Sequence, residues 1–320
     1  MILAGDIGGT KTVLALYDNQ LVMQRRKTYP SQSFPGLAPI LADFLGDAVK
    51  PAAAGFGIAG PVRDGACTAT NLPWQVSVED IAAHTGIDRV ALVNDLVATA
   101  HGLMYLPDEA FVELNPGTAQ IDPQGTIAVL AAGTGLGEAI VCRVGDRITA
   151  LPTEGGHTDF APRNERDDRL LAYLRSLYPD HVSNERVISG LGIPVLYDFL
   201  DNESPHVANP ELAAALDAGE GAAAIGLHAL GGDPQARTAI DWFCDLYGAE
   251  AGNMALKTLA TGGVILGGGI APKLLPILRE GGFWNAFTAK GRFRDLLVGL
   301  SVRVCLDQDA ALLGAAAVAS

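Results

Sequence analysis

Two glycine–threonine loops, each following an apolar stretch of strand-forming residues, are the segments best suited to chemistry. One is Gly5-Asp6-Ile7-Gly8-Gly9-Thr10 and the other is Gly133-Thr134-Gly135-Leu136-Gly137. Glycine lets the backbone turn tightly and bring its N–H groups close to an anion, and a threonine hydroxyl adds a neutral donor. The pair Asn94-Asp95 lies between the two loops in the sequence. This pattern predicts a phosphate clamp with a general base beside it.

Other interpretations of the glycine patterns are weaker. The first loop departs from a P-loop, because Thr10 stands where that motif requires glycine before Lys11. The segment Gly55–Gly60 fits the dinucleotide fingerprint GxGxxG, but a turn signature follows it at once in place of a long helix. We therefore expect neither a P-loop nor a dinucleotide site. The second glycine–threonine loop alone is almost equally consistent with a tight hairpin turn, so its interpretation depends on the other motifs.

Charged side chains accompany the first loop and the Asn-Asp pair. Asp6 lies inside the loop, where it is either a turn aspartate or a carboxylate that reaches Mg²⁺ through a retained water. Lys11 is equally consistent with a phosphate contact and with a solvated charge. Asp95 follows a buried strand, so it is either a cap of the strand end or a general base, with Asn94 bonding a hydroxyl beside it.

Two further carboxylates lie later in the chain. Glu154-Gly155-Gly156-His157 brings a carboxylate and an imidazole together across two glycines, so both can reach one polar target such as two adjacent hydroxyls. A metal pair is the alternative, although no cysteine cluster or HExxH spacing supports it. His157-Thr158-Asp159 is also consistent with a contact that fixes the imidazole. Glu185 is as consistent with a carboxylate in the first turn of a helix as with a site residue.

The elements that position these residues alternate between strands and helices. Strands are expected at residues 1–4, 13–17, 52–58, 89–93, 126–132, 138–143, 262–269 and 302–306. Helices are expected at residues 77–85, 96–103 and 310–318 and over most of 166–260. Asn94-Asp95 thus lies at a strand-to-helix junction, where open α/β sheets place functional groups. The second half of this order echoes the first, with a strand, a glycine loop and a strand.

Composition restricts the class of protein. The chain has 320 residues and a formal net charge of −14, which argues against nucleic acid or an anionic membrane as the main partner. The four cysteines, Cys67, Cys142, Cys244 and Cys305, are far apart and are expected to be reduced thiols. With no basic leader at the N-terminus and no apolar stretch of membrane length, we expect a soluble, cytoplasmic protein.

In order along the chain, these motifs resemble those of the bacterial glucokinases in the hexokinase/actin-like ATPase superfamily. The resemblance covers nearly the whole chain and rests on Gly5–Thr12, Leu92–Asp95, Ala132–Gly137, Glu154–Pro162, Glu185–Gly190 and Gly267–Ile270. ROK-type sugar kinases and repressors carry a cysteine-rich zinc motif after their Glu-x-Gly-His, which this chain lacks, and no DNA-binding domain is expected before the first strand. The resemblance is therefore to the zinc-free branch, although Lys11 stands in the position after the first threonine that is often held by asparagine.

The resemblance implies two actin-like (ribonuclease H-like) α/β domains flanking a cleft. The small domain would hold residues 1–108 plus roughly 298–320, and the large domain 109–297. The implied reaction is transfer of the γ-phosphoryl group of Mg-ATP to the 6-hydroxyl of glucose, with Asp95 as general base. Glucose would be held by Asn94, Asp95, Glu154, His157 and Glu185. ATP would be held by Gly5, Asp6, Ile7, Gly8, Gly9, Thr10, Lys11, Gly133, Thr134, Gly135, Gly268 and Gly269, with Asp6 reaching Mg²⁺ through water.

The resemblance also implies a homodimer. Two alternatives remain open at this point. One is a kinase for another hexose or an amino sugar, such as mannose, fructose or glucosamine, because the pocket at the sugar's C2 position is not evident in the sequence. The other is a sugar sensor that keeps the fold without catalysis, although a sensor has no need of a base at Asp95.

Overall fold

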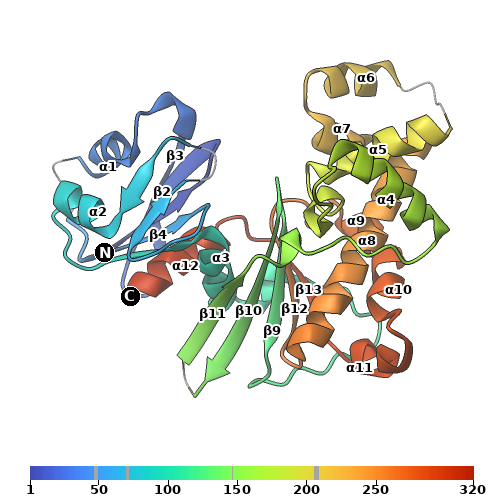
Figure 1. Cartoon of the computed structure of the whole chain (residues 1–320). Coiled ribbons are helices and arrows are strands. Elements are labelled where there is room, and N and C mark those ends of the chain that lie inside the picture. Colours follow the sequence, from blue (N-terminus) through green and yellow to red (C-terminus); the bar gives the residue numbers. More distant parts are fainter. Residues whose placement is uncertain (47–49, 70–71, 146, 205–208) are drawn as a thin grey trace. The chain divides into compact units, whose positions relative to one another are not determined.

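The computed structural model describes residues 1–46, 50–69, 72–145, 147–204 and 209–320 (Figure 1). Within these residues the chain divides into two compact units. Unit 1 comprises Met1–Ala110, Arg143–Pro152 and Asp307–Ser320, and unit 2 comprises Phe111–Cys142 and Thr153–Leu306. In the part of the chain that the structure describes, no helix combines the length and the apolar character that a membrane span requires.

Unit 1 is built on a five-stranded sheet with the order β3-β2-β1-β4-β7. β1 pairs antiparallel with β2 and parallel with β4, and β7 extends the parallel side. The strands are β1 (Ile2–Ile7), β2 (Lys11–Tyr17), β3 (Met23–Pro30), β4 (Ala53–Ile58) and β7 (Val90–Asn94), and a small ribbon joins β5 (Ala66–Thr68) to β6 (Gln75–Ser77).

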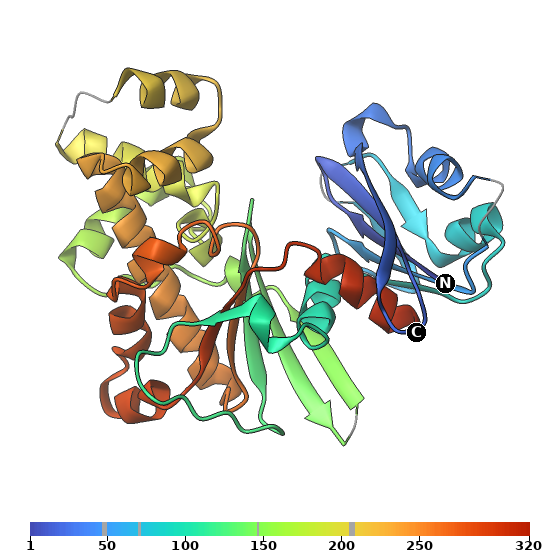
Figure 2. The ribbon, with the colours of Figure 1, turned by 180° about the vertical axis from the view of Figure 1, so that it is seen from behind.

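Helices cover both faces of this sheet. Side chains alternate between the faces of a strand, so Leu3 and Ile7 pack on the side of α1 and α2, whereas Ile2 and Ala4 pack on the side of α3 and α12. α12 lies beside α3 (Figures 1 and 2), because Gly102 and Gly314 leave room for close approach of the two backbones. The helices are α1 (Leu37–Leu45), α2 (Val78–Thr85), α3 (Asp95–Leu103) and α12 (Ala310–Ala319), with short 3-10 turns at Ser31–Ser33 and Asp108–Ala110.

The second sheet has six strands in the order β11-β10-β9-β12-β13-β8. β9 pairs antiparallel with β10 and parallel with β12, and β13 extends the parallel side. These directions repeat those of β1, β2, β4 and β7, so the echo expected from the sequence is present in the topology. The strands are β8 (Phe111–Glu113), β9 (Ile127–Ala132), β10 (Leu136–Val144), β11 (Arg147–Thr153), β12 (Gly263–Gly267) and β13 (Val302–Cys305).

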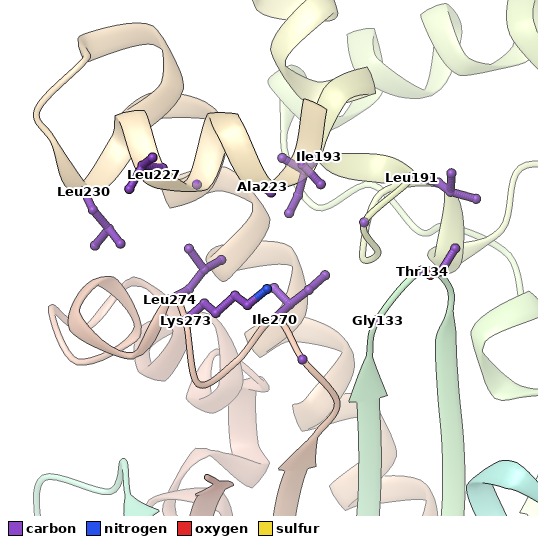
Figure 3. Close-up of a pocket in the computed structure, with 14 residues that line it drawn as sticks. Gly133, Thr134, Leu191, Ile193, Ala223, Leu227, Leu230, Ile270, Lys273 and Leu274 are labelled. Carbon is purple, nitrogen blue, oxygen red and sulfur yellow. The ribbon is translucent and has the colours of Figure 1, made fainter. Parts of the chain in front are cut away.

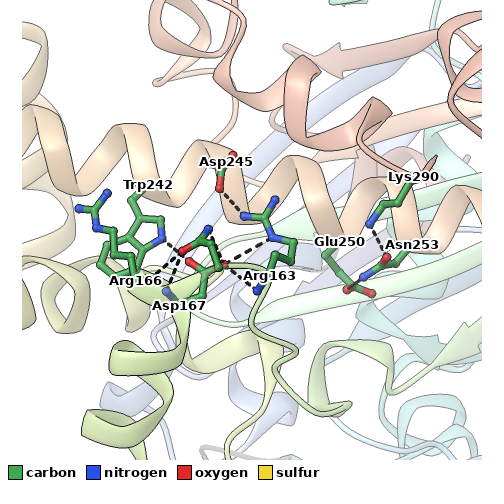
Figure 4. Close-up of polar contacts among 9 residues, drawn as sticks. Arg163, Arg166, Asp167, Trp242, Asp245, Glu250, Asn253 and Lys290 are labelled. Atoms are coloured by element: carbon green, nitrogen blue, oxygen red, sulfur yellow. Dashed lines mark hydrogen bonds and ion pairs between the residues drawn. The ribbon is translucent and has the colours of Figure 1, made fainter.

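The helices of unit 2 surround α8, which carries much of the apolar core, including Phe243 and Tyr247. α4 is attached to α8 by Asp167, whose buried carboxylate accepts a hydrogen bond of 2.9 Å from the indole N–H of Trp242 (Figure 4). The helices are α4 (Glu165–Leu177), α5 (Gly192–Glu203), α6 (Pro210–Asp217), α7 (Gly221–Leu230), α8 (Pro234–Thr258), α9 (Leu275–Leu278), α10 (Gly282–Thr288) and α11 (Arg294–Val298), with 3-10 turns at Gly155–His157, Asn184–Arg186 and Gly291–Phe293.

The expected α/β class, strands and helices are confirmed, with ends shifted by a few residues. Ser77 caps α2 as expected, because its hydroxyl accepts a hydrogen bond from the backbone N–H of Asp80. One placement was wrong. Asp6 lies inside β1, paired with Val13, and not in the loop, because the hydrogen-bonded ladder continues through Ile7 before the chain turns.

Candidate functional site

The first glycine loop is the turn between β1 and β2. The backbone N–H of Gly8 donates to the carbonyl of Lys11 at 3.0 Å, which closes the turn. Ser31 supports the turn from the side: its hydroxyl donates to the carbonyl of Gly8 at 2.7 Å, and its N–H donates to the carbonyl of Thr10 at 3.0 Å. Lys11 is exposed. The loop is thus held in shape by its own backbone and by one neighbouring serine.

Asp6 and Asp95 act on each other electrostatically. Asp6 is half-buried and, by alternation along β1, lies on the face that α3 and α12 cover. Burial and, to a smaller extent, the negative charge of Asp95 raise the pKa of Asp6 to about 6, while Lys11 opposes the shift. Two carboxylates in such an environment are stabilised by a cation, and Mg²⁺ is held in proteins by one or two carboxylates and retained waters. The residues present therefore fit a magnesium ion.

Asn94 and Asp95 lie where β7 ends and α3 begins. The side-chain oxygen of Asn94 accepts a hydrogen bond of 2.9 Å from the N–H of Leu96, so Asn94 caps the helix. Its amide N–H₂ donates to the carbonyl of Gly60 at 3.2 Å. Asp95 is the first residue of α3, and its Oδ1 accepts a hydrogen bond of 2.8 Å from the same N–H of Leu96. Asp95 thus lies at the N-terminus of α3, where the helix dipole is positive.

The second glycine loop is the turn between β9 and β10. Its carbonyl at Gly133 accepts a hydrogen bond of 2.7 Å from the N–H of Gly190. Glu185, in the 3-10 turn just before Gly190, places Oε2 at 2.8 Å from the N–H of Leu136 in the loop. A Cβ atom on Gly135 would lie 2.3 Å from that oxygen. The structure thus joins Glu185, which nothing in its local sequence singled out, to the second loop.

Glu154 and His157 lie at the two ends of a short 3-10 turn. Their side chains are exposed, and His157 Nε2 lies 4.0 Å from Glu154 Oε2. Asp159 does not orient the His157 imidazole, because the Asp159 carboxylate is paired with another histidine: its Oδ1 lies 3.4 Å from Nδ1 of His181. His181 instead contacts the backbone carbonyl of His157 at 2.8 Å. Among the described residues, no group of three or more histidine, cysteine and carboxylate side chains is placed to hold a metal, so no third ligand joins Glu154 and His157 at this turn.

Unit 2 also contains an apolar pocket of about 800 Å³ beside the second loop (Figure 3). Gly133 and Thr134 line it on the loop side, and Gly269 lines it at the end of β12. Lys273 extends along it toward Ile270 and is the one charged side chain among the described lining residues (Figure 3). The remaining lining residues are small or aliphatic: Gly190, Leu191, Ile193, Ala222, Ala223, Gly226, Leu227, Leu230, Ile270 and Leu274. A cavity of this size and character suits a nucleoside.

Sequence reasoning missed most of this pocket. α7 contributes small apolar side chains such as Ala223 and Gly226, which look like ordinary helix packing until the tertiary structure brings them opposite the second loop. Gly269, which the sequence analysis assigned to ATP, lines the pocket. Gly268 is not among the lining residues; it has a φ of 78°, and a Cβ atom there would lie 2.4 Å from the carbonyl of Ala132, so its glycine is required by the turn itself.

Comparison with known proteins adds an independent line of evidence. A family model described as glucokinase matches residues 3–320. The chain is 40% identical to a glucokinase from Nostoc sp., over 100% of this chain and 99% of that protein. It is 36% identical to a bifunctional protein from Paraburkholderia xenovorans, over 99% of this chain but 48% of the longer protein.

Solved structures agree with these relatives. A glucokinase from an Antarctic psychrotroph superposes with a TM-score of 0.81 at 31% identity, over 99% of this chain and 98% of that one. A ROK family glucokinase from Streptomyces griseus, solved in complex with glucose and AMPPNP, superposes with a TM-score of 0.68 at 22% identity, over 99% and 98% of the two chains. The second likeness bears on the fold alone. The expected actin-like α/β fold is therefore confirmed.

Proposed function

Since this chain belongs to the glucokinase family and is an ATP-dependent glucose kinase, we propose that Asp95 is its general base. Asp95 takes the proton from the 6-hydroxyl of D-glucose as that oxygen attacks the γ-phosphorus of Mg-ATP. The products are glucose 6-phosphate and ADP. The observation that carries this proposal is the position of Asp95 at the N-terminus of α3, close enough to Asp6 to raise the pKa of that carboxyl.

Glucose binding follows from side chains that match a sugar hydroxyl, which both donates and accepts hydrogen bonds. Carboxylates accept, an amide does both, and a neutral imidazole does both. The proposed glucose-binding residues are Asn94, Asp95, Glu154, His157 and Glu185. Glu185 is held by the N–H of Leu136, so its second carboxylate oxygen is directed by the second glycine loop.

The two glycine loops bind the phosphates of ATP through their backbone N–H groups. Asp6 holds Mg²⁺ through a retained water, and the ion, when bound, neutralises charge that develops on the phosphoryl oxygens. The apolar pocket takes the adenosine, and Lys273 stabilises negative charge at its edge. Most of the rate enhancement in such a reaction comes from positioning and from fixed charge, since the protein supplies little covalent chemistry.

The test is replacement of the base. In Asp95→Ala and Asp95→Asn, kcat should fall by about 10²–10⁴-fold, because a positioned base contributes that much. Glucose binding, followed by calorimetry without ATP, should remain measurable. Asp88→Asn, at an exposed aspartate seven residues earlier in the sequence, serves as control and should retain wild-type turnover. Turnover close to wild type in folded Asp95→Ala would contradict the assignment.

Substrate range and assembly are tested separately. ADP release should be strong with glucose and weak with mannose, fructose, glucosamine or no sugar. Binding of glucose without any ADP release would favour a sugar sensor. We also propose a cytoplasmic protein that forms a homodimer. The family resemblance implies the homodimer, and light scattering at working concentrations decides the oligomeric state.

A further inference from the structure

Glu138 is a buried acid that the proposed reaction does not use. It lies in β10 opposite Leu130 of β9, on the same face of the strand as Leu136 and Ile140, which pack into the core of unit 2. Glu138 is 1% exposed. Neither carboxyl oxygen has a hydrogen-bond partner among the described residues. A carboxylate in such a place is costly, because nothing replaces the water that it loses.

The glucose-binding turn lies directly against this acid. A Cβ atom on Gly155 would lie 2.0 Å from Glu138 Oε2, so the carboxyl group fills the space beside the Gly155 backbone. The same turn is tied to β10 through Thr153, whose hydroxyl donates to the carbonyl of Glu138 at 2.8 Å and accepts from the N–H of Gly155 at 3.1 Å. A movement of the Glu138 carboxyl group therefore displaces the backbone between Glu154 and His157.

The other side of Glu138 faces α8. Glu250 on that helix is buried, with 3% of its surface exposed; Lys257 lies 3.3 Å from Glu250 Oε1, and Asn253 donates to Glu250 Oε2 (Figure 4 shows Glu250 and Asn253). Tyr247 also faces this region from α8. Burial and the charge of Glu250 raise the pKa of Glu138, against the opposing charge of Lys257, to about 7. Both forms of Glu138 are therefore populated near neutral pH.

We propose that Glu138 is a positioning residue for the turn from Glu154 to His157, which it supports only as the neutral acid. When Glu138 ionises, the charge must regain water, and on the side of α8 it meets the buried Glu250 and Tyr247. Moving the exposed turn costs less free energy than opening the core. Glu154 and His157 therefore leave their binding positions, and glucose affinity falls. This inference rests on the proposed role of those two residues in binding glucose.

The test is glucose binding by calorimetry without ATP, from pH 6 to pH 8.5. The wild-type Kd should rise by roughly 10-fold, since about 3% of a group with a pKa near 7 is still neutral at pH 8.5 and residual binding by the ionised form limits the loss. Glu138→Gln keeps the shape of the neutral acid and cannot ionise, so its Kd should stay within about twofold over this range. Glu211→Gln, at an exposed position on α6, is the control and should follow the wild type.

Two further measurements separate this role from a merely structural one. In steady-state assays the rise with pH should appear in the KM for glucose, with kcat at saturating glucose little changed. Glu250→Gln removes the neighbouring like charge and so lowers the pKa of Glu138, and the midpoint of the rise in Kd should therefore move to lower pH than in the wild type. This variant also provides the test if Glu138→Gln does not fold.

The outcomes differ for the two proposals. The same pH-dependent rise in Glu138→Gln as in the wild type would overturn the role of Glu138 and leave the kinase assignment intact. So would a wild-type Kd that does not change with pH. Failure of the wild type to bind glucose at any pH would overturn the proposed binding residues, and this inference with them.

Discussion

The two glycine loops share a backbone design and differ in their side chains. Each is the turn of an antiparallel hairpin whose first strand pairs on its other side with a parallel strand, β4 in one case and β12 in the other. The first loop has charged neighbours, namely Asp6, Lys11 and Asp95. The second borders a largely apolar pocket, and the carboxylate beside it, Glu185, accepts a hydrogen bond from the loop itself.

This difference matches the separate roles that the proposed function gives to the two turns. Under that proposal the backbone N–H groups of both loops bind phosphate, the charged loop suits the metal and the reacting phosphoryl group, and the neutral loop suits the nucleoside end. Burial, followed by the charge of Asp95, raises the pKa of Asp6, and the positive charge of Lys11 offsets this rise only in part. The comparison therefore predicts unequal consequences when each loop is altered.

The largest effect is expected from removing the charge at the first loop. Asp6→Asn should lower kcat by about 100-fold, because metal-linked charge stabilisation is worth several kcal/mol and about 1.4 kcal/mol is a factor of ten. More Mg²⁺ should be needed for half-maximal activity. The measurement is ADP release as a function of Mg²⁺ at saturating ATP and glucose. Unchanged kcat and an unchanged Mg²⁺ requirement would show that the two loops are equivalent.

A smaller effect is expected from adding a methyl group to the second loop. In Gly135→Ala the new Cβ atom would lie 2.3 Å from Glu185 Oε2, so the carboxylate must move and its bond to Leu136 weakens. We expect about a 10-fold loss in kcat/KM, because a lost hydrogen bond to a charged group costs about 1.5 kcal/mol or more. Gly133→Ala is the matched control, since open space surrounds its Cβ position. Equal losses in both variants would refute the steric explanation.

The smallest effect is on stability, and its sign depends on pH. The pKa of Asp6 is raised in the fold to about 6 from an ordinary value of 3.8, so the ionised carboxyl group favours unfolding. Stability that the neutral acid provides at low pH is lost as pH rises through 6. Without metal or ligand, Asp6→Asn should therefore be more stable than wild type at pH 7.5, with the difference shrinking toward pH 4. Thermal unfolding across this range tests it, and a difference that is constant with pH would contradict it.

Much of the fold could be predicted from local patterns. Apolar runs that end in glycine or Asn-Asp located β1, β4, β7, β9 and β12, because buried strands are nearly uniform in hydrophobicity. The edge strands β3 and β11 were missed, since their mostly exposed residues give no such signal. Asp6 was assigned to a loop because hydrogen bonding between strands, which extends β1 to Ile7, is not visible in a single segment.

The sequence by itself determined which chemical groups this protein has: two glycine turns, an Asn-Asp pair at a strand end, and a Glu-Gly-Gly-His turn. These follow from local backbone preferences and short spacings. Only the tertiary structure decided which groups meet. It placed Glu185 on the second loop, assembled an apolar pocket from α7 and the chain after β12, and buried Glu138 against Gly155. Such contacts join residues far apart in the chain, and burial and electrostatics depend on everything packed around a group.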